Sequence, residues 1–384
     1  MKFFNNLFSL IKEGKDFGSI GIAEVIGAII SSGFWFYLAS IIEPSEYGEI
    51  HFILSIGVIA STLSILGNQN SITVLVAKGK EIQSTISFIS LSLSLITSTI
   101  IILIFNKFDF GVIIIAYVIN TIAIGELIGK KQFMSYSKYL ILQKVLTLII
   151  GLGFLHFFGS EGIIYGLSLT YSLYLIIIVR IFKNIPINFK LIKQKFNFLV
   201  SGYGLNLVTV LEGQIDKIII LPVLGGVILG NYSLALQMIS IFTIIMSVMS
   251  KILLSRESTG EDNKSLIKKF LIFSGFLTAL VFMFSPIITS IFFSKYEELQ
   301  NTIQVMGLSI IIYAINVVIM SKLLAREKSF QILFSGIISL IISIVGVFTL
   351  GIIFGTFGMG ITYVISLIAQ CIFLLICFKG VNNE

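Results

Sequence analysis

The chain has 384 residues, of which 56% are hydrophobic and only 12% are charged, and its formal net charge is +7 at pH 7. Its mean hydropathy is +1.04, and a soluble domain of this size could not shield so much apolar surface from water. The composition therefore excludes a water-soluble globular protein and predicts a polytopic membrane protein. The positive charge does not indicate a nucleic-acid partner, because Lys and Arg are spread over many short gaps between apolar stretches.

The apolar stretches are long enough for membrane-spanning helices, which need about 20 mostly apolar residues. A transmembrane β-barrel would show alternating apolar and polar residues over about 10 positions, whereas residues 86–105 and 332–354 are continuous runs of Ile, Leu, Val, Phe, Ser, Thr and Gly. We therefore predict an all-α fold. Its twelve expected spans, in chain order, are residues 18–42, 48–76, 84–105, 110–129, 139–158, 162–182, 197–221, 228–253, 267–293, 301–324, 329–353 and 357–378.

Lys and Arg fall almost entirely into alternate gaps between these spans. One set of gaps includes both chain ends and is rich in Lys and Arg, and the other set holds only Lys107 and Lys295. Because cytoplasmic loops carry the excess of Lys and Arg, both termini are predicted to be cytoplasmic and the number of spans to be even. We expect a multipass protein of the cytoplasmic membrane.

A long polar connection near the middle of the chain suggests two halves. We predict an N-terminal six-helix lobe over residues 1–183, a cytoplasmic linker over 184–196 and a C-terminal six-helix lobe over 197–384. An even number of spans in each lobe makes the two lobes parallel repeats, as in several secondary transporters.

The seventh predicted span carries polar and charged residues that fall on one side of a helix. They include Asn206, Glu212, Asp216 and Lys217, and at 1.5 Å per residue the stripe extends roughly 16 Å. Because a charge at mid-membrane costs about 2.5 to 3.5 kcal/mol, such residues usually face a bundle interior or a watery cavity. The stripe predicts a lined cavity. The alternative is a buried ion pair of Lys217 with one of the two carboxylates, and the two interpretations can coexist.

Two further candidate charges for the cavity lie in the predicted N-terminal lobe. Glu24 in the first span is a carboxylate that could bind a proton or sodium ion, or hydrogen-bond a serine of a neighbouring helix. Lys144 in the fifth span could reach the inner membrane surface or supply a cavity cation for an anionic substrate. No catalytic, nucleotide-binding or metal-ligand motif is evident. We therefore expect no enzyme activity, no cofactor and no metal.

Two short motifs carry a family resemblance. Residues 44–48, with the sequence PSEYG, are similar to a P-x-x-Y-G turn, and residues 214–220 followed by Leu229–Tyr232 are similar to a passage that opens the second half of the same proteins. With its twelve predicted spans, the chain resembles the Wzx-like polysaccharide-biosynthesis flippases of the multidrug/oligosaccharidyl-lipid/polysaccharide (MOP) exporter superfamily. The resemblance implies two MATE-like six-helix lobes around a central cavity, and alternating access.

The resemblance also implies a substrate. It predicts export of a polyisoprenyl-linked oligosaccharide, in contact with membrane lipids and with H⁺ or Na⁺ as a coupling ion. The expected cavity residues are Glu24, Lys144, Asn206, Glu212, Asp216 and Lys217. The alternative is a cation-coupled small-molecule exporter of the multidrug type. A membrane glycosyltransferase is disfavoured, because the loops are too short for a catalytic domain.

Overall fold

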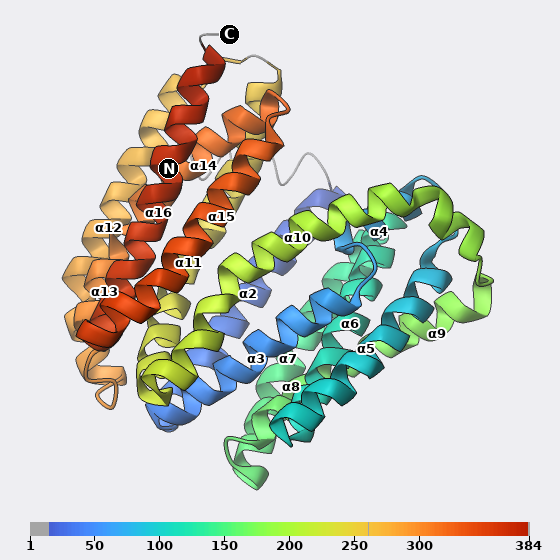
Figure 1. The fold of residues 1–384 in the computed structure, drawn as a ribbon, viewed down its shortest axis with the longest axis horizontal. Helices are drawn as coiled ribbons and strands as arrows, with labels where there is room; N and C mark the ends of the chain where they lie inside the picture. Colours follow the sequence, from blue (N-terminus) through green and yellow to red (C-terminus); the bar gives the residue numbers. More distant parts are fainter. Residues whose placement is uncertain (1–14, 260, 383–384) are drawn as a thin grey trace. The chain divides into compact units, whose positions relative to one another are not determined.

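The computed structural model describes residues 15–259 and 261–382 of the chain. Within these ranges all regular structure is helical (Figure 1). Ten segments of the described residues are long and apolar enough to cross a membrane. The prediction of an all-α polytopic membrane protein is therefore confirmed.

The helices pack into two compact units. Unit 1 comprises the described residues up to Trp35 together with Ile53–Val210, and unit 2 comprises Phe36–Phe52 together with the described residues from Leu211 onward. Three helices, α2 (Lys15–Ile41), α3 (Pro44–Ser64) and α10 (Phe189–Leu224), therefore have one part in each unit. The lobes of residues 1–183 and 197–384 are assigned from loop polarity and stay a prediction.

The remaining helices of unit 1 follow one another in chain order. They are α4 (Gln69–Ala77), α5 (Gln83–Phe105), α6 (Phe108–Gly129), α7 (Phe133–Phe158), α8 (Gly162–Tyr171), the 3₁₀ turn η1 (Ser172–Tyr174) and α9 (Leu175–Asn184). Their core consists mainly of Ile, Leu and Val, with Tyr174 fully buried among them.

The second predicted span, 48–76, is not one helix. The chain breaks between α3 and α4 because Gly67 has a positive φ of 93°, a conformation that costs glycine little. Asn68 then caps α4, since its side chain accepts a hydrogen bond from Ser71 N at 2.6 Å and donates one to Gly202 O at 2.9 Å.

Unit 2 contains the remaining helices. They are α11 (Gly226–Ser258), α12 (Lys264–Phe292), α13 (Leu299–Gly307), α14 (Ser309–Ala325), α15 (Ser329–Gly346), the π-helical turn η2 (Val347–Gly351) and α16 (Ile352–Asn382). The backbone of Gly355 is not helical (φ 58°, ψ −135°), so α16 is interrupted there. Glu298 caps the following turn by accepting a hydrogen bond from Thr356 N at 3.0 Å.

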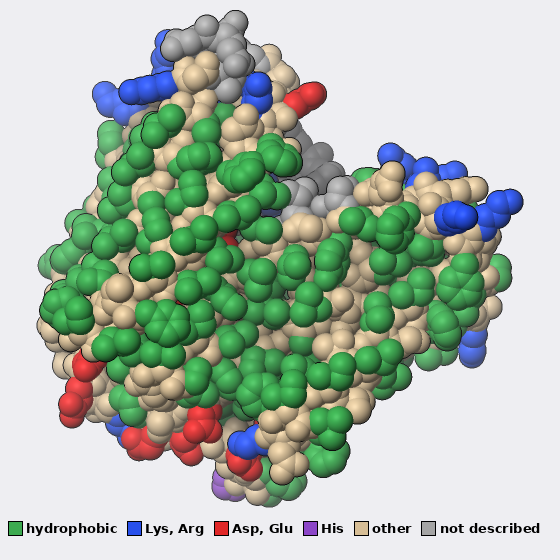
Figure 2. Space-filling model, viewed as in Figure 1, with side chains coloured by type: hydrophobic (Ala, Val, Ile, Leu, Met, Phe, Trp, Pro, Cys, Tyr) green, Lys and Arg blue, Asp and Glu red, His purple; other side chains and the backbone are tan. Residues whose placement is uncertain are grey.

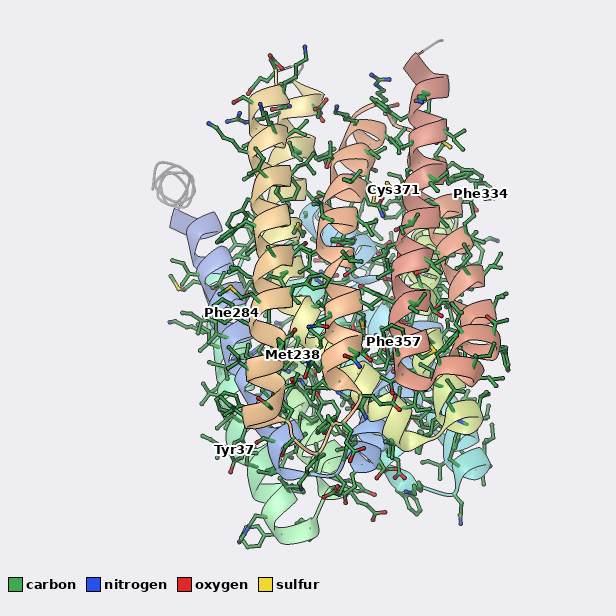
Figure 3. The ribbon with its side chains drawn as sticks, turned by 90° about the vertical axis from the view of Figure 1, so that its left-hand side faces the viewer. Tyr37, Met238, Phe284, Phe334, Phe357 and Cys371 are labelled. Atoms are coloured by element: carbon green, nitrogen blue, oxygen red, sulfur yellow. The ribbon has the colours of Figure 1, made fainter. Side chains whose placement is uncertain are left out.

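On α5 and α15, small polar residues face inward and large apolar residues face outward. On α5, Ser90, Ser94 and Ser98 are buried at helical spacing, and Ser98 donates a hydrogen bond to Gly111 O at 3.0 Å, whereas Leu103 of the same helix is 77% exposed. On α15 the buried residues are serines and glycines, while Phe334 is exposed at the edge of unit 2 (Figure 3). This arrangement is typical of helices that pack together while surrounded by lipid.

The two ends of unit 2 differ in charge. Lys322, Arg326 and Lys328 lie where α14 ends and α15 begins, whereas Glu43, Glu297 and Glu298 lie near the other end, where α12 gives way to α13. In Figure 2 most of the basic side chains seen on this unit lie at its top, beside an acidic one, and most of the acidic side chains lie at its bottom, with hydrophobic side chains covering the helices between. The polarity matches the loop pattern of the sequence, and the orientation of the termini stays a prediction.

Candidate functional site

The polar stripe lies on α10, the 36-residue helix that both units share. Asn206 lies in unit 1 and is half-buried, whereas Glu212, Asp216 and Lys217 lie in unit 2. The burial of the stripe changes along the helix. Gly213 is exposed, but Asp216 and Lys217 are 5% and 9% exposed.

Asp216 and Lys217 form a buried, hydrogen-bonded pair. Asp216 accepts hydrogen bonds from Tyr232 Oη at 2.7 Å and from Lys217 N at 2.8 Å. Lys217 Nζ lies 3.7 Å from Asp216 Oδ1 and donates to Gly213 O at 2.6 Å and to Gln214 Oε1 at 3.3 Å. Both charges are compensated, which makes their burial tolerable. This is the geometry of the ion-pair interpretation, and the assignment of these residues to a substrate cavity stays a prediction.

Glu212 belongs to a second polar network that links four helices of unit 2. It accepts hydrogen bonds from Gln370 Nε2 of α16 at 3.1 Å and from Ser339 of α15. Gln370 Oε1 in turn accepts a hydrogen bond from Asn316 Nδ2 of α14 at 3.2 Å. Gln370, Ser339 and Asn316 are buried, whereas Glu212 itself is half-buried. The helical spacing of α10 predicted Glu212 as a site residue, but its partners could not be predicted because they lie on helices remote in sequence.

The two family-like motifs pack directly against each other. A Cβ atom added to Gly230 would lie 1.8 Å from Pro44 O, and one added to Gly48 would lie 2.3 Å from Gly226 O and 2.9 Å from Gly230 N. Only glycine permits so close an approach of the α3 and α11 backbones. The adjacent Tyr47 and Tyr232 are fully buried. Since Tyr232 also binds Asp216, this helix contact positions the buried ion pair.

The N-terminal candidates lie in unit 1. Glu24 is exposed on α2, and Lys144 is half-buried on α7. The stem of Lys144 packs against α2 at Gly27, where an added Cβ would lie 3.4 Å from Lys144 Cγ. Gly27 is about one helical turn from Glu24. The structure thus places Glu24, Lys144 and Asn206 in one unit, and Glu212, Asp216 and Lys217 in the other.

A cavity of about 610 Å³ lies elsewhere in unit 2, lined by residues of α2, α11, α12 and α13. None of the six predicted site residues lines it. The walls of this cavity are apolar, and apolar residues of membrane helices carry no sequence signal that separates a cavity wall from a lipid-facing surface. The cavity could therefore not be predicted from the sequence. Among residues 15–259 and 261–382, no group of three or more His, Cys, Asp or Glu side chains could hold a metal ion.

The sequence model of the polysaccharide biosynthesis protein family matches residues 14–254, which is more than half of the chain. The chain belongs to this family. A second model, that of the lipid II flippase MurJ, matches residues 226–380. No curated protein matches the chain in sequence.

Solved structures show which fold this family member shares. A lipid II flippase MurJ in an inward closed conformation superposes with a TM-score of 0.75 at 14% identity, covering 94% of this chain and 87% of that one. An inward-facing multidrug resistance MATE family transporter of the MOP superfamily gives 0.70 at 14% identity, covering 94% and 96%. A MOP superfamily transporter from Pyrococcus furiosus gives 0.59 at 14% identity, covering 95% and 94%. The family member therefore has the fold of MOP superfamily transporters.

Proposed function

We propose that the protein is a flippase that translocates a lipid-linked oligosaccharide across the cytoplasmic membrane by alternating access, without an enzymatic step. The observation that carries this proposal is the match of the polysaccharide biosynthesis family over residues 14–254. The match of the lipid II flippase model over residues 226–380 supports it from the second half of the chain. We further propose twelve spans with both termini in the cytoplasm.

In this proposal the polar residues bind the two chemical parts of the substrate. Amides and carboxylates bind sugar hydroxyls well, and Glu212 with Gln370 and Asn316 offers both groups in one network. Lys217 and Lys144 are the candidate cations for the phosphate of the lipid carrier. A phosphate would compete with Asp216 for Lys217, so substrate binding would open the pair that is closed in this structure.

The carboxylates also supply candidate positions for a coupling ion. Glu24 lies in the candidate membrane span Ile20–Ile41 of α2, and Glu212 lies on α10. Desolvation of a carboxylate within a membrane favours binding of H⁺ or Na⁺. We propose that one of them exchanges such an ion during the transport cycle.

Reconstitution tests the proposal. The purified protein is placed in liposomes that contain a fluorescent polyisoprenyl-linked oligosaccharide, and its movement between leaflets is followed by quenching from outside. We expect the wild type to translocate the lipid, and the Asp216→Ala/Lys217→Ala variant to do so much more slowly. The matched control is Arg256→Ala/Glu261→Ala, because that exposed pair has the same 3.7 Å separation.

Each outcome of this experiment has a defined meaning. Equal rates in the wild type and the Asp216→Ala/Lys217→Ala variant would remove those two residues from the mechanism. Absence of wild-type translocation above that of empty liposomes would refute the flippase itself.

A second candidate function is multidrug export. It is favoured by the likeness to an inward-facing multidrug resistance MATE family transporter, at a TM-score of 0.70. A cation-coupled multidrug exporter would remove cationic dyes from cells, and removal would depend on Glu24 or Glu212. Dye efflux that is abolished by Glu212→Gln, without lipid translocation in liposomes, would favour this alternative.

A further inference from the structure

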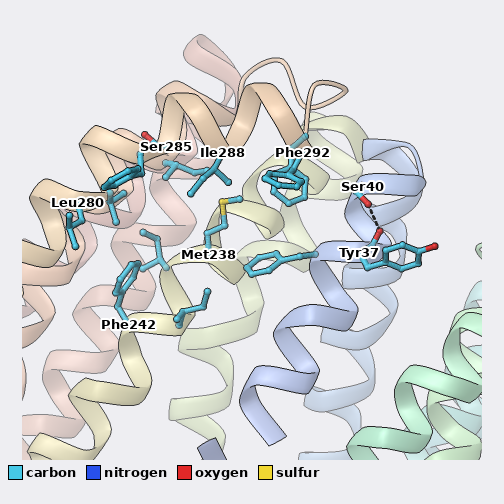
Figure 4. Close-up of a pocket in the computed structure, with 15 residues that line it drawn as sticks. Tyr37, Ser40, Met238, Phe242, Leu280, Ser285, Ile288 and Phe292 are labelled. Carbon is cyan, nitrogen blue, oxygen red and sulfur yellow. Dashed lines mark hydrogen bonds between the residues drawn. The ribbon is translucent and has the colours of Figure 1, made fainter. Parts of the chain in front are cut away.

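Most of the wall of the apolar cavity of unit 2 comes from three helices, α2, α11 and α12, and Ile303 of α13 completes it. Its walls include Phe36 and Tyr37 of α2, Met238 and Phe242 of α11, and Ile288 of α12, and we call it the α2–α11–α12 pocket. Met238 points from α11 toward Ile288 of α12 (Figure 4). In Figure 3, Tyr37, Met238 and Phe284 lie on the same side of unit 2. Its volume of about 610 Å³ is within the range of small-molecule sites.

The walls of this pocket offer almost no polar atom to a ligand. Apart from the tyrosine, its polar residues are Ser40 and Ser285, and the Ser40 hydroxyl already donates a hydrogen bond to Tyr37 O at 2.7 Å. Several wall residues are open at the rim, among them Tyr37, Phe284 and Ile288. An apolar pocket that opens between membrane helices is accessible to hydrocarbon chains and suits no sugar.

A cation lies next to one end of the pocket. Lys295 follows the lining residue Phe293 by two positions, and its Nζ bonds to Ile41 O at 3.4 Å and to Glu43 Oε1 at 2.9 Å. Ile41 directly follows the lining residue Ser40. An ammonium group has three donors, and two are used in these bonds. The third can bind a phosphate oxygen, and Glu43 would oppose that binding.

We propose that the α2–α11–α12 pocket binds the hydrocarbon chain of a polyisoprenyl phosphate, with the phosphate at Lys295. The choice of an isoprenoid chain over other lipids rests on the proposed function. Because lipid tails are as apolar as the pocket walls, binding gains no hydrophobic free energy relative to the bilayer. Selectivity must therefore come from the shape of the aromatic walls and from the phosphate contact.

Photolabelling of the full chain in lipid nanodiscs tests this proposal. The probe is farnesyl phosphate that carries a diazirine on its chain, and labelled peptides are identified by mass spectrometry. We expect labelling of α11 and α12 peptides that contain the wall residues. Unlabelled farnesyl phosphate should compete well, whereas farnesol, which lacks the phosphate, and hexadecyl phosphate, which lacks the branched chain, should compete poorly.

Two matched pairs of variants locate the site. Ile288→Trp and Met238→Trp place an indole in the pocket, whereas Ile287→Trp and Met283→Trp place it on the lipid-facing side of α12, where neither residue lines the pocket. We expect the first two to lower probe affinity by at least about tenfold, because apolar pockets discriminate even single methylene groups by that factor. The two control variants should label as the wild type does. Ile288 is at the open rim, so its variant is expected to fold even if Met238→Trp does not.

A charge series tests the phosphate end. Lys295→Gln should weaken the binding of farnesyl phosphate but not that of farnesol. Glu43→Gln should strengthen the binding of farnesyl phosphate, because it removes the opposing carboxylate. Lys107→Gln is the control, because Lys107 pairs with Glu161 in unit 1 in a similar way.

Four results would overturn the proposal. They are labelling outside the α2–α11–α12 pocket, equal labelling of the Ile288→Trp and Ile287→Trp variants, equal competition by hexadecyl phosphate, and an unchanged affinity in Lys295→Gln. The binding assay is independent of transport. Lipid translocation in liposomes without labelling of the pocket would support the proposed function and refute this inference. Labelling of the pocket without lipid translocation would support this inference and refute the proposed function.

Discussion

Asp216 and Lys217 are adjacent residues whose charges compensate each other in a buried environment. Removing only one charge leaves the other uncompensated, which typically costs about 3 to 5 kcal/mol for a buried pair. We therefore predict that Asp216→Asn lowers the unfolding temperature of the purified protein in detergent strongly. The double variant Asp216→Leu/Lys217→Met should recover much of the loss, because it removes both charges. Thermal unfolding followed by intrinsic fluorescence measures both effects.

The control for this prediction is the exposed Arg256–Glu261 pair, which has the same 3.7 Å separation. Exposed pairs contribute about 0 to 1 kcal/mol, so Glu261→Gln should leave the unfolding temperature nearly unchanged. An Asp216→Asn variant that unfolds at the wild-type temperature would show that the pair does not stabilise unit 2.

The hydrogen bonds of Asp216 and Glu212 could be predicted only in part from the sequence. Helical spacing predicted that Asp216, Lys217 and Glu212 lie on one side of a helix, and an ion pair was one of the two interpretations offered. The hydrogen-bond partners Tyr232 and Gln370 are 16 and 158 residues from their acceptors. Which helices touch cannot be derived from periodicity within one helix, so these bonds required the structure.

At the scale of helices, the contact of α3 with α11 depends on glycine. The Cβ added by Gly230→Ala would lie 1.8 Å from the backbone oxygen of Pro44, so the two helices must move apart. Overpacking of this kind costs about 1 to 3 kcal/mol or more, and we predict a lower unfolding temperature and lower yield of monodisperse protein. Gly275→Ala is the control, because its nearest neighbour would be Ile311 Cδ1 at 3.8 Å. That variant should be neutral or slightly stabilising, and equal behaviour of the two would refute the prediction.

The interruption of α16 at Gly355 leads to a second prediction, which concerns the stability of the helix that resumes there. Glu298 accepts the hydrogen bond of Thr356 N, one of the backbone donors left unpaired where the helix resumes. Loss of a helix cap typically costs about 0.5 to 2 kcal/mol, so Glu298→Ala should lower the unfolding temperature. Glu297→Ala removes the same charge one residue earlier and serves as the control. If both variants unfold at the same temperature, the cap does not stabilise the helix.

Hydropathy predicted most helix positions within a few residues but not the interruptions inside them. The eighth predicted span, 228–253, corresponds to α11 over Gly226–Ser258. The second, 48–76, is broken at Gly67 into α3 and α4. Such breaks depend on backbone conformation and on caps such as Asn68 and Glu298, which leave the average apolarity of a segment unchanged. The average hydropathy of a segment therefore cannot reveal them.

At the scale of the whole molecule, composition was sufficient for the fold class but not for the number of crossings. The last of the ten candidate spans, Ser329–Gly380, contains both α15 and α16. The long helix α10 is absent from the candidates, because the charges that mark it as a candidate site also lower its apolarity. Twelve crossings therefore require that α15 and α16 each cross and that α10 crosses as well, and the last requirement needs a direct test.

Cysteine accessibility in whole cells provides that test. In a Cys371→Ala/Cys377→Ala background, single cysteines replace Lys183, which precedes α10, and Val227, which follows it. If α10 crosses the membrane, a membrane-impermeant maleimide should label the cysteine at 227 in intact cells and the one at 183 only after permeabilisation. Lys328→Cys and Lys295→Cys are the references for the inner and outer sides, since the first lies in a lysine-rich gap and the second does not. Labelling of 183 and 227 from the same side would mean that α10 returns to the side it came from, which contradicts twelve spans and the cytoplasmic position of both termini together.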